Sequence, residues 1–151
     1  MDRQFLKKKG GVKKVGLLNR ELARFISQQG HQDLLMVVDA GFAIHKDLDV
    51  IDLSLSINVP TVLQVLAVLK DYYSVEKMII SHETKNISPT LFNNIKNSFG
   101  PNVEVELVKH HILKIKSKDV KVVIRTGDFT AYGNVILVAG AGDRWYLEKG
   151  V

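Results

Sequence analysis

Residues 30–41 read GHQDLLMVVDAG and contain the segment that decides the fold. Five apolar residues in succession, Leu34 to Val38, are typical of a strand covered on both faces, because a half-exposed strand would alternate apolar and polar positions. Gly30 precedes this segment and ends the helical pattern before it, and Asp39-Ala40-Gly41 forms a polar turn after it. A strand of this kind belongs in a sheet that carries helices on both faces.

Helical and extended patterns alternate along the rest of the chain. Helices are predicted from an N-cap at Asn19 to Gly30, from Pro60 to about Tyr73, and from Ser88-Pro89 to Gly100-Pro101. Further strands are predicted at residues 51–57, 78–80, 103–107, 120–124 and 135–138. Strands separated by helical patterns predict an α/β layered domain with a largely parallel sheet.

Composition and cysteine content restrict the class of protein. The 151 residues are 46% hydrophobic and 25% charged, which is ordinary for one folded domain with a substantial core. Because there are no cysteines, disulfides, thiolate metal sites and cysteine nucleophiles are excluded. The same absence fits a reducing compartment.

The net charge of +5 is concentrated at the start of the chain. Residues 1–14 hold six of the 21 lysine and arginine residues and one of the 16 acidic residues, so the remaining 137 residues are neutral. We therefore expect residues 1–12 to be a flexible basic extension, with nucleic-acid binding by this tail as a weaker alternative. No apolar run reaches the roughly 18–20 residues that a membrane span needs, and no signal peptide is recognisable. We therefore expect a cytoplasmic protein.

The polar residues around the predicted buried strand allow two interpretations. His31 follows a helix end, where it could bond the last carbonyl groups or act as a protonated acid. Asp33 could orient His31 or bond the backbone of a turn. Asp39 lies at the carboxyl end of the strand, where α/β sheets bind ligands, and could cap the turn or contact a ligand.

Several common catalytic sites are absent from the sequence. The five histidines show no H-x-x-x-H or H-E-x-x-H spacing, and adjacent His110 and His111 point in different directions, so we expect no metal. Residues 140–142, GAG, lack the third glycine of a dinucleotide-binding loop. There is also no Walker loop and no G-x-S-x-G elbow, which argues against a kinase and a hydrolase.

Residues 123–137, VIRTGDFTAYGNVIL, form the most informative polar segment. A strand and a turn lead to Tyr132-Gly133-Asn134, which would place a phenol and an amide at one edge of the sheet. An amide for paired hydrogen bonds and an aromatic ring for a sugar face suit a hydroxyl-rich ligand. The alternative is a β-hairpin in which the tyrosine packs at a corner and the asparagine serves the turn.

The motifs together resemble the D-ribose pyranase family, whose members are ribose mutarotases. They occur in the order of that family: LLN at 17–19, GHQD at 30–33, VVDAG at 37–41, IDLSL at 51–55, VPTVLQVL at 59–66 and the segment 123–137. The resemblance implies a single three-layer α/β/α domain over residues 13–151, with a central, largely parallel mixed sheet. It also implies cytoplasmic ring assemblies, commonly decamers, with sites between subunits.

The resemblance also implies a reaction, which is the interconversion of the β-pyranose and β-furanose forms of D-ribose without a cofactor. The furanose would supply ribokinase beside a ribose transporter. Opening a cyclic hemiacetal needs one proton to leave the anomeric hydroxyl and another to reach the ring oxygen, which suits histidine. By motif, the implied roles are His31 as proton donor and, as sugar ligands, Asp39, His110, Tyr132, Gly133 and Asn134. Asp33 is a possible orienter of His31.

Some segments depart from the ribose pattern. Ala43-Ile44-His45 replaces the usual Pro-Ile-Pro and is similar to the related L-fucose mutarotases, whereas Gly41 and IDLSL favour ribose. An enzyme for another aldose and a sugar-binding module without turnover are therefore the alternatives, and roles for His45 and His111 stay open. Residues from about 142 form an atypical extension, in which Trp145 and Tyr146 could extend a subunit contact or crowd the site.

Overall fold

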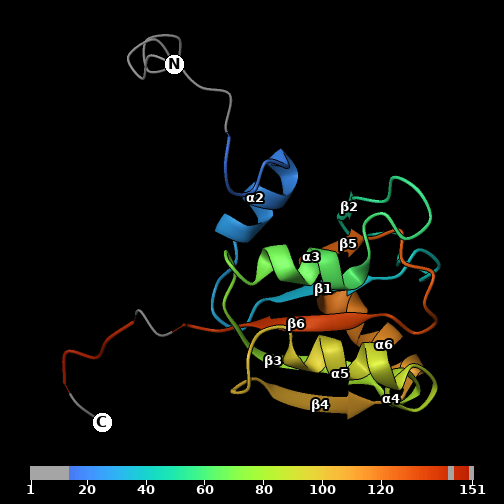
Figure 1. Cartoon of the computed structure of the whole chain (residues 1–151). Helices are drawn as coiled ribbons and strands as arrows, with labels where there is room; N and C mark the ends of the chain where they lie inside the picture. Colours follow the sequence, from blue (N-terminus) through green and yellow to red (C-terminus); the bar gives the residue numbers. More distant parts are fainter. Residues whose placement is uncertain (1–13, 143–144, 150–151) are drawn as a thin grey trace.

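The computed structural model describes residues 14–142 and 145–149, and it is built on one six-stranded sheet (Figure 1). The strand order is β2-β5-β1-β6-β3-β4. Only β6 is antiparallel to its neighbours, β1 and β3, and the other pairs are parallel. The bounds are β1 Leu34–Val38, β2 Val50–Asp52, β3 Val75–Ser81, β4 Glu104–Val108, β5 Val122–Arg125 and β6 Val135–Ala139. The predicted largely parallel mixed sheet is confirmed.

Helices lie on both faces of this sheet, which confirms the predicted α/β/α layering (Figure 1). One face is covered by α2, α3 and α5, and the other by α6 together with residues 42–48. The remaining helix, α4, follows β3 and contacts α5. The bounds are α2 Arg20–Ser27, α3 Val62–Leu69, α4 His82–Ile87, α5 Pro89–Asn97 and α6 His110–Lys116, which continues into a 3-10 turn, Ser117–Asp119.

Strand β1 has the burial that its apolar run predicts. Leu35 and Val37 belong to the core cluster under α2, α3 and α5, whereas Met36 and Val38 belong to the cluster under α6. All four side chains are fully buried, at 0% exposure. Alternate side chains of a strand point to opposite faces, so a strand inside a three-layer fold is apolar at every position.

The predicted helices are present but shorter than expected. Asn19 caps α2 by accepting a hydrogen bond from the Leu22 amide, as predicted. The predicted helix 60–73 spans only α3, because a capping box formed by Thr61 and Gln64 begins it and tight turns follow Leu69. In the helix predicted at 88–100, the residues after Asn97 likewise leave the α-helical pattern.

Two predictions about extended segments are wrong. The predicted strand 51–57 ends at Asp52, whose side chain accepts a hydrogen bond from the Ser54 amide and turns the chain; Leu55 and Ile57 are 83% and 61% exposed. The alternative hairpin in residues 123–137 is excluded because β1 lies between β5 and β6. Helices α4 and α6 had no predicted counterpart.

The remaining segment predictions have different outcomes. The basic extension predicted for residues 1–12 lies outside the described residues. Within residues 14–142 and 145–149, no helix has the length and apolar character needed to span a bilayer.

Candidate functional site

The carboxyl end of β1 brings together two of the predicted motifs. The Asp39 carboxylate accepts hydrogen bonds from the Gly41 amide at 3.0 Å and from the Gly133 amide at 3.2 Å. The Asn134 side-chain oxygen accepts a hydrogen bond from the Asp39 amide at 2.9 Å. Segments more than 90 residues apart in sequence are therefore joined at one edge of the sheet.

Asp39 sits in an environment that shifts the pKa of its carboxyl group. Its partial burial raises the pKa of the carboxyl above its usual value, and hydrogen bonds from the Gly41 and Gly133 amides oppose that shift. The backbone amides fix the direction of the carboxylate. A fixed, half-buried carboxyl group is well suited to bind the hydroxyl groups of a sugar.

Tyr132 has an unusual backbone conformation beside Asp39. Its φ of 58° lies in the left-handed region, which few residues other than glycine adopt. The Thr84 hydroxyl, from α4, donates a hydrogen bond to the Tyr132 carbonyl at 2.6 Å and holds this turn. Strained positions of this kind are concentrated at functional sites, so the turn agrees with a binding role.

His110 packs against the same turn. Its ring meets the Tyr132 ring edge-on, with centroids 5.1 Å apart, and the Phe42 ring at 6.1 Å. Glu83, from α4, accepts the His110 backbone hydrogen bond and so caps α6. The Nδ1 atom of His110 is buried, and within the described part of the chain it has no hydrogen-bond partner. A buried polar atom without a partner is uncommon in folded proteins, and it marks His110 for attention in the search for a site.

His111 and His45, whose roles the sequence leaves open, have surroundings different from those of His110. His111 is exposed, whereas the ring of His110 packs against the Tyr132 turn. His45 lies in the loop that covers the second face, and its Nδ1 atom accepts a hydrogen bond from the Asp47 amide at 3.4 Å.

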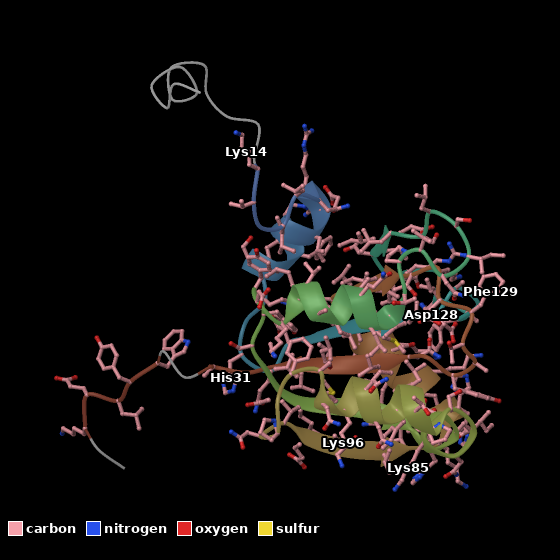
Figure 2. All side chains as sticks on the ribbon, in the orientation of Figure 1. Lys14, His31, Lys85, Lys96, Asp128 and Phe129 are labelled. Carbon is pink, nitrogen blue, oxygen red and sulfur yellow. The ribbon has the colours of Figure 1, made fainter. Side chains whose placement is uncertain are left out.

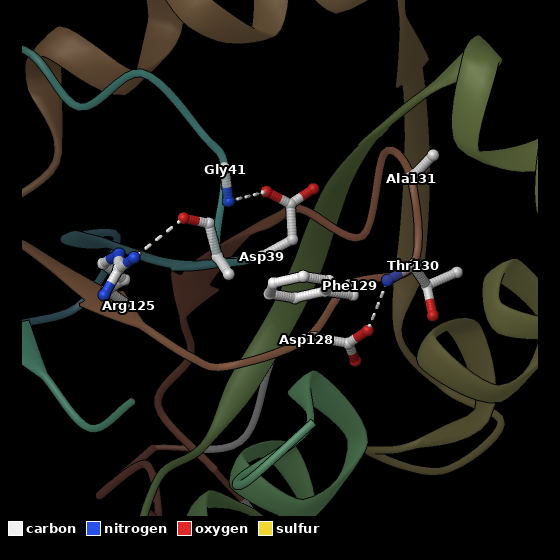
Figure 3. Close-up of a pocket in the computed structure, with 8 residues that line it drawn as sticks. Asp39, Gly41, Arg125, Asp128, Phe129, Thr130 and Ala131 are labelled. Carbon is white, nitrogen blue, oxygen red and sulfur yellow. Dashed lines mark hydrogen bonds between the residues drawn. The ribbon is translucent and has the colours of Figure 1, made fainter. Parts of the chain in front are cut away.

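A cavity of about 430 Å³ opens beside Asp39 (Figure 3). Its wall includes Arg125 at the end of β5 and the exposed ring of Phe129. The Arg125 guanidinium donates to the Ala40 carbonyl at 3.0 Å and to the Asp52 carboxylate at 3.1 Å. Arg125 thus ties the motif after β1 to β2, a function that was not predicted from the sequence. Asp128, Thr130 and Ala131 complete the wall.

His31 lies at the opposite end of the sheet from this cavity (Figure 2). It comes before β1, whereas Asp39 comes after it. The six residue steps from Asp33 to Asp39 span about 20 Å in a strand. Within a single chain, His31 and Asp39 therefore do not meet in one pocket, because an extended strand separates the two ends of β1.

The predicted partnership of His31 and Asp33 is also corrected. The Nε2 atom of His31 lies 3.1 Å from a carboxylate oxygen of Glu76, in β3. Asp33 instead accepts a hydrogen bond from the Gly30 amide at 2.7 Å and pairs with the Lys121 ammonium at 3.0 Å. Asp33 thus closes a turn, and Glu76 is the residue that contacts the histidine.

These contacts predict the outcome of Asp33→Asn. The hydrogen bond from Gly30 and the contact with Lys121 hold the pKa of Asp33 below its usual 3.8. The resulting stabilisation is complete above about pH 4 and is lost as pH falls through the lower folded-state pKa. Thermal melts should therefore show wild type more stable than Asp33→Asn near neutral pH, with the difference closing in acid. A difference that is independent of pH would contradict this account.

His31 borders a second hollow, of about 520 Å³. Its wall includes the buried ring of Tyr73, the exposed ring of Tyr72 and Gly140 at the end of β6. Trp145, from the predicted C-terminal extension, lies on the same wall and is 78% exposed. Within the described residues, no group of three or more histidine, aspartate or glutamate side chains is arranged to hold a metal ion.

Comparison with known proteins places this chain in a family. The RbsD / FucU transport protein family matches residues 12–142. A D-ribose pyranase from Pseudothermotoga lettingae is 38% identical over 140 residues, which cover 93% of this chain and 100% of the relative. This chain belongs to the RbsD/FucU family. The resemblance drawn from the motifs is confirmed.

Other RbsD/FucU relatives agree. A D-ribose pyranase from Clostridium novyi is 41% identical over 129 residues, covering 85% of this chain and 98% of the relative. The structure of Bacillus subtilis RbsD complexed with D-ribose matches with a TM-score of 0.82 and 38% identity, over 86% of this chain and 98% of that chain. The Streptococcus pneumoniae fucose mutarotase in complex with L-fucose, at 15% identity and a TM-score of 0.68, covers 82% of this chain and 94% of its own and shares the fold.

Proposed function

We propose that this RbsD/FucU protein is a D-ribose pyranase, an isomerase that interconverts the β-pyranose and β-furanose forms of D-ribose. The observation that carries the proposal is the joined cluster of Asp39, Gly133 and Asn134 with the unpartnered Nδ1 atom of His110 beside it. The 38% identity to a protein of the same fold complexed with D-ribose supports ribose as the ligand.

Each step of the reaction exchanges protons with two oxygens of the sugar. In ring opening, the anomeric hydroxyl loses a proton, the ring oxygen gains one, and the bond from C1 to the ring oxygen breaks. In reclosure, a different hydroxyl adds to C1, loses its proton, and the carbonyl oxygen becomes the new anomeric hydroxyl. His31 is proposed to give the proton to the ring oxygen, while Asp39, His110, Tyr132, Gly133 and Asn134 hold the sugar. This chemistry requires no cofactor and no metal.

The distance between His31 and Asp39 supports a site shared by two subunits. His31 is 55% exposed at one end of β1, so it is free to reach the cavity of a neighbouring chain. Exposed apolar residues beside the cavity, on two adjoining loops, would be covered in such an assembly: Leu55, Ile57, Val59 and Phe129. We propose a ring-based homo-oligomer, a decamer, with each site formed between subunits.

The proposed metabolic role of the enzyme follows from its product, the furanose form of ribose. Ribokinase consumes the furanose form, so the protein would serve ribose catabolism in the cytoplasm, downstream of a ribose transporter. The partners proposed are D-ribose and further copies of the chain, with no nucleic acid and no membrane insertion.

Magnetisation-transfer NMR tests the proposed reaction. Adding the protein to equilibrated D-ribose should speed exchange between the pyranose and furanose anomeric signals, with weaker effects on L-fucose and D-allose. Stronger acceleration of fucose would assign the enzyme to another aldose. Ribose binding in calorimetry without faster exchange of any sugar would contradict the proposal and indicate a sugar-binding module.

A further inference from the structure

Glu76 occupies an irregular position in β3. Val75 pairs with Ala139 of β6, but Lys77 pairs with the preceding residue, Val138, so Glu76 is an extra residue in this ladder. An extra residue of this kind is a β-bulge, which bends the strand and redirects a side chain. Bulges often lie next to active sites for this reason.

The redirected side chain meets His31. A Glu76 carboxylate oxygen lies 3.1 Å from His31 Nε2, and the two side chains are 39% and 55% exposed. The neighbouring ionic groups have other partners, since Lys77 binds Glu106 at 3.0 Å and Lys121 binds Asp33 at 3.0 Å. The Glu76 carboxylate is therefore left to contact the histidine.

Gly140 keeps the bulge in place. A Cβ atom at position 140 would lie 3.1 Å from both the Cβ atom and the backbone nitrogen of Glu76. This spacing is tighter than side chains normally allow, so glycine lets the end of β6 lie against the bulge. The Gly140 amide also donates a hydrogen bond to the Ser74 carbonyl at 2.8 Å.

We propose that Glu76 is a positioning residue for the catalytic histidine. Its carboxylate accepts a hydrogen bond from Nε2–H of His31, which fixes the orientation of the ring and leaves Nδ1 as the nitrogen that exchanges a proton with the sugar. The proposal rests on the proposed pyranase reaction, although the contact itself can be measured without the sugar.

Glu76→Gln tests the proposal against a matched variant, Glu106→Gln, in the next strand. For histidines that bind a metal, loss of the orienting carboxylate typically costs about 10–100-fold, and we take the same range for His31. We therefore expect Glu76→Gln to lower the exchange rate at saturating ribose by that factor with little change in KM, and Glu106→Gln to behave like wild type. Wild-type rates in Glu76→Gln would overturn the proposal, whereas a wild-type protein that accelerates no sugar would refute the pyranase function instead.

The tautomer of His31 gives a second readout that needs no activity. Ring ¹⁵N NMR signals should show a neutral Nε2–H tautomer in wild type and in Glu106→Gln, and a mixture of tautomers in Glu76→Gln. Gly140→Ala keeps the carboxylate but displaces it, so it should produce the same change in a protein that still melts cooperatively. An unchanged tautomer in Glu76→Gln would overturn the proposal.

Discussion

Mixing His31→Ala subunits with Asp39→Ala subunits is expected to restore exchange activity that neither variant has alone. His31→Ala removes the proposed acid, and positioned acid–base catalysis contributes about 10²–10⁴-fold, so this variant should fall near the uncatalysed rate. Asp39→Ala removes the carboxylate that Gly41 and Gly133 hold at the other end of β1. Because the extended strand β1 separates the two residues along one chain, with about 20 Å between Asp33 and Asp39 alone, a working site needs them from different chains.

The amount of activity recovered depends on how many sites are intact after the two variants, mixed in equal amounts, reassemble at random. About a quarter of the sites would then combine an intact His31 with an intact Asp39. The exchange rate should be measured after the variants are unfolded together and refolded, and compared with each variant refolded alone. No recovery in a mixture that demonstrably contains mixed oligomers would contradict the shared site.

Gly127→Ala is expected to have the largest effect on stability. A Cβ atom at this position would overlap the Ser56 carbonyl oxygen and lie 2.9 Å from the Val59 carbonyl oxygen. Both neighbours are backbone atoms of the loop at residues 55–60. Two hydrogen bonds tie this loop to Gly127: the Asn58 amide donates to the Gly127 carbonyl, and the Gly127 amide donates to the Pro60 carbonyl. Overpacking of this kind costs about 1–3 kcal/mol, and occasionally more, which for a chain of this size corresponds to a fall in Tm of roughly 2–12 °C.

Gly41→Ala provides the matched control for that measurement. The same substitution there would place Cβ 3.9 Å from the Asp39 carboxylate, which is an ordinary contact. Calorimetric melts should therefore show a large fall in Tm for Gly127→Ala and a small one for Gly41→Ala. Equal shifts in the two variants would show that the loop at 55–60 moves away easily.

The sequence predicted the centre of the fold better than its edges. The apolar run 34–38 specifies a central strand because both of its faces are buried, and β1 has those bounds. The alternation at 51–57 was misleading because the Asp52 side chain turns the chain after three residues of strand. Helix α6 had no apolar repeat long enough to reveal it, and its cap comes from Glu83, 27 residues away.

The residues of the candidate site were likewise predictable only where they carry a local motif. Asp39 and the segment 132–134 carry recognisable motifs, and the structure joins them. Glu76 has no motif, because its contact with His31 depends on a bulge and on Gly140 rather than on local spacing. A single sequence carries no signal for that contact, whereas the separation of His31 from Asp39 follows from the length of the predicted strand 34–38.

The antiparallel direction of β6 links two neighbouring sites of the proposed ring. Asn134, just before β6, holds the Asp39 backbone at the end proposed to bind the sugar, whereas Gly140, just after β6, lies against Glu76 at the histidine end. If each histidine serves the adjacent chain, the two ends of this one strand belong to different active sites. The five buried residues of β6 therefore span the distance between these two ends of the sheet.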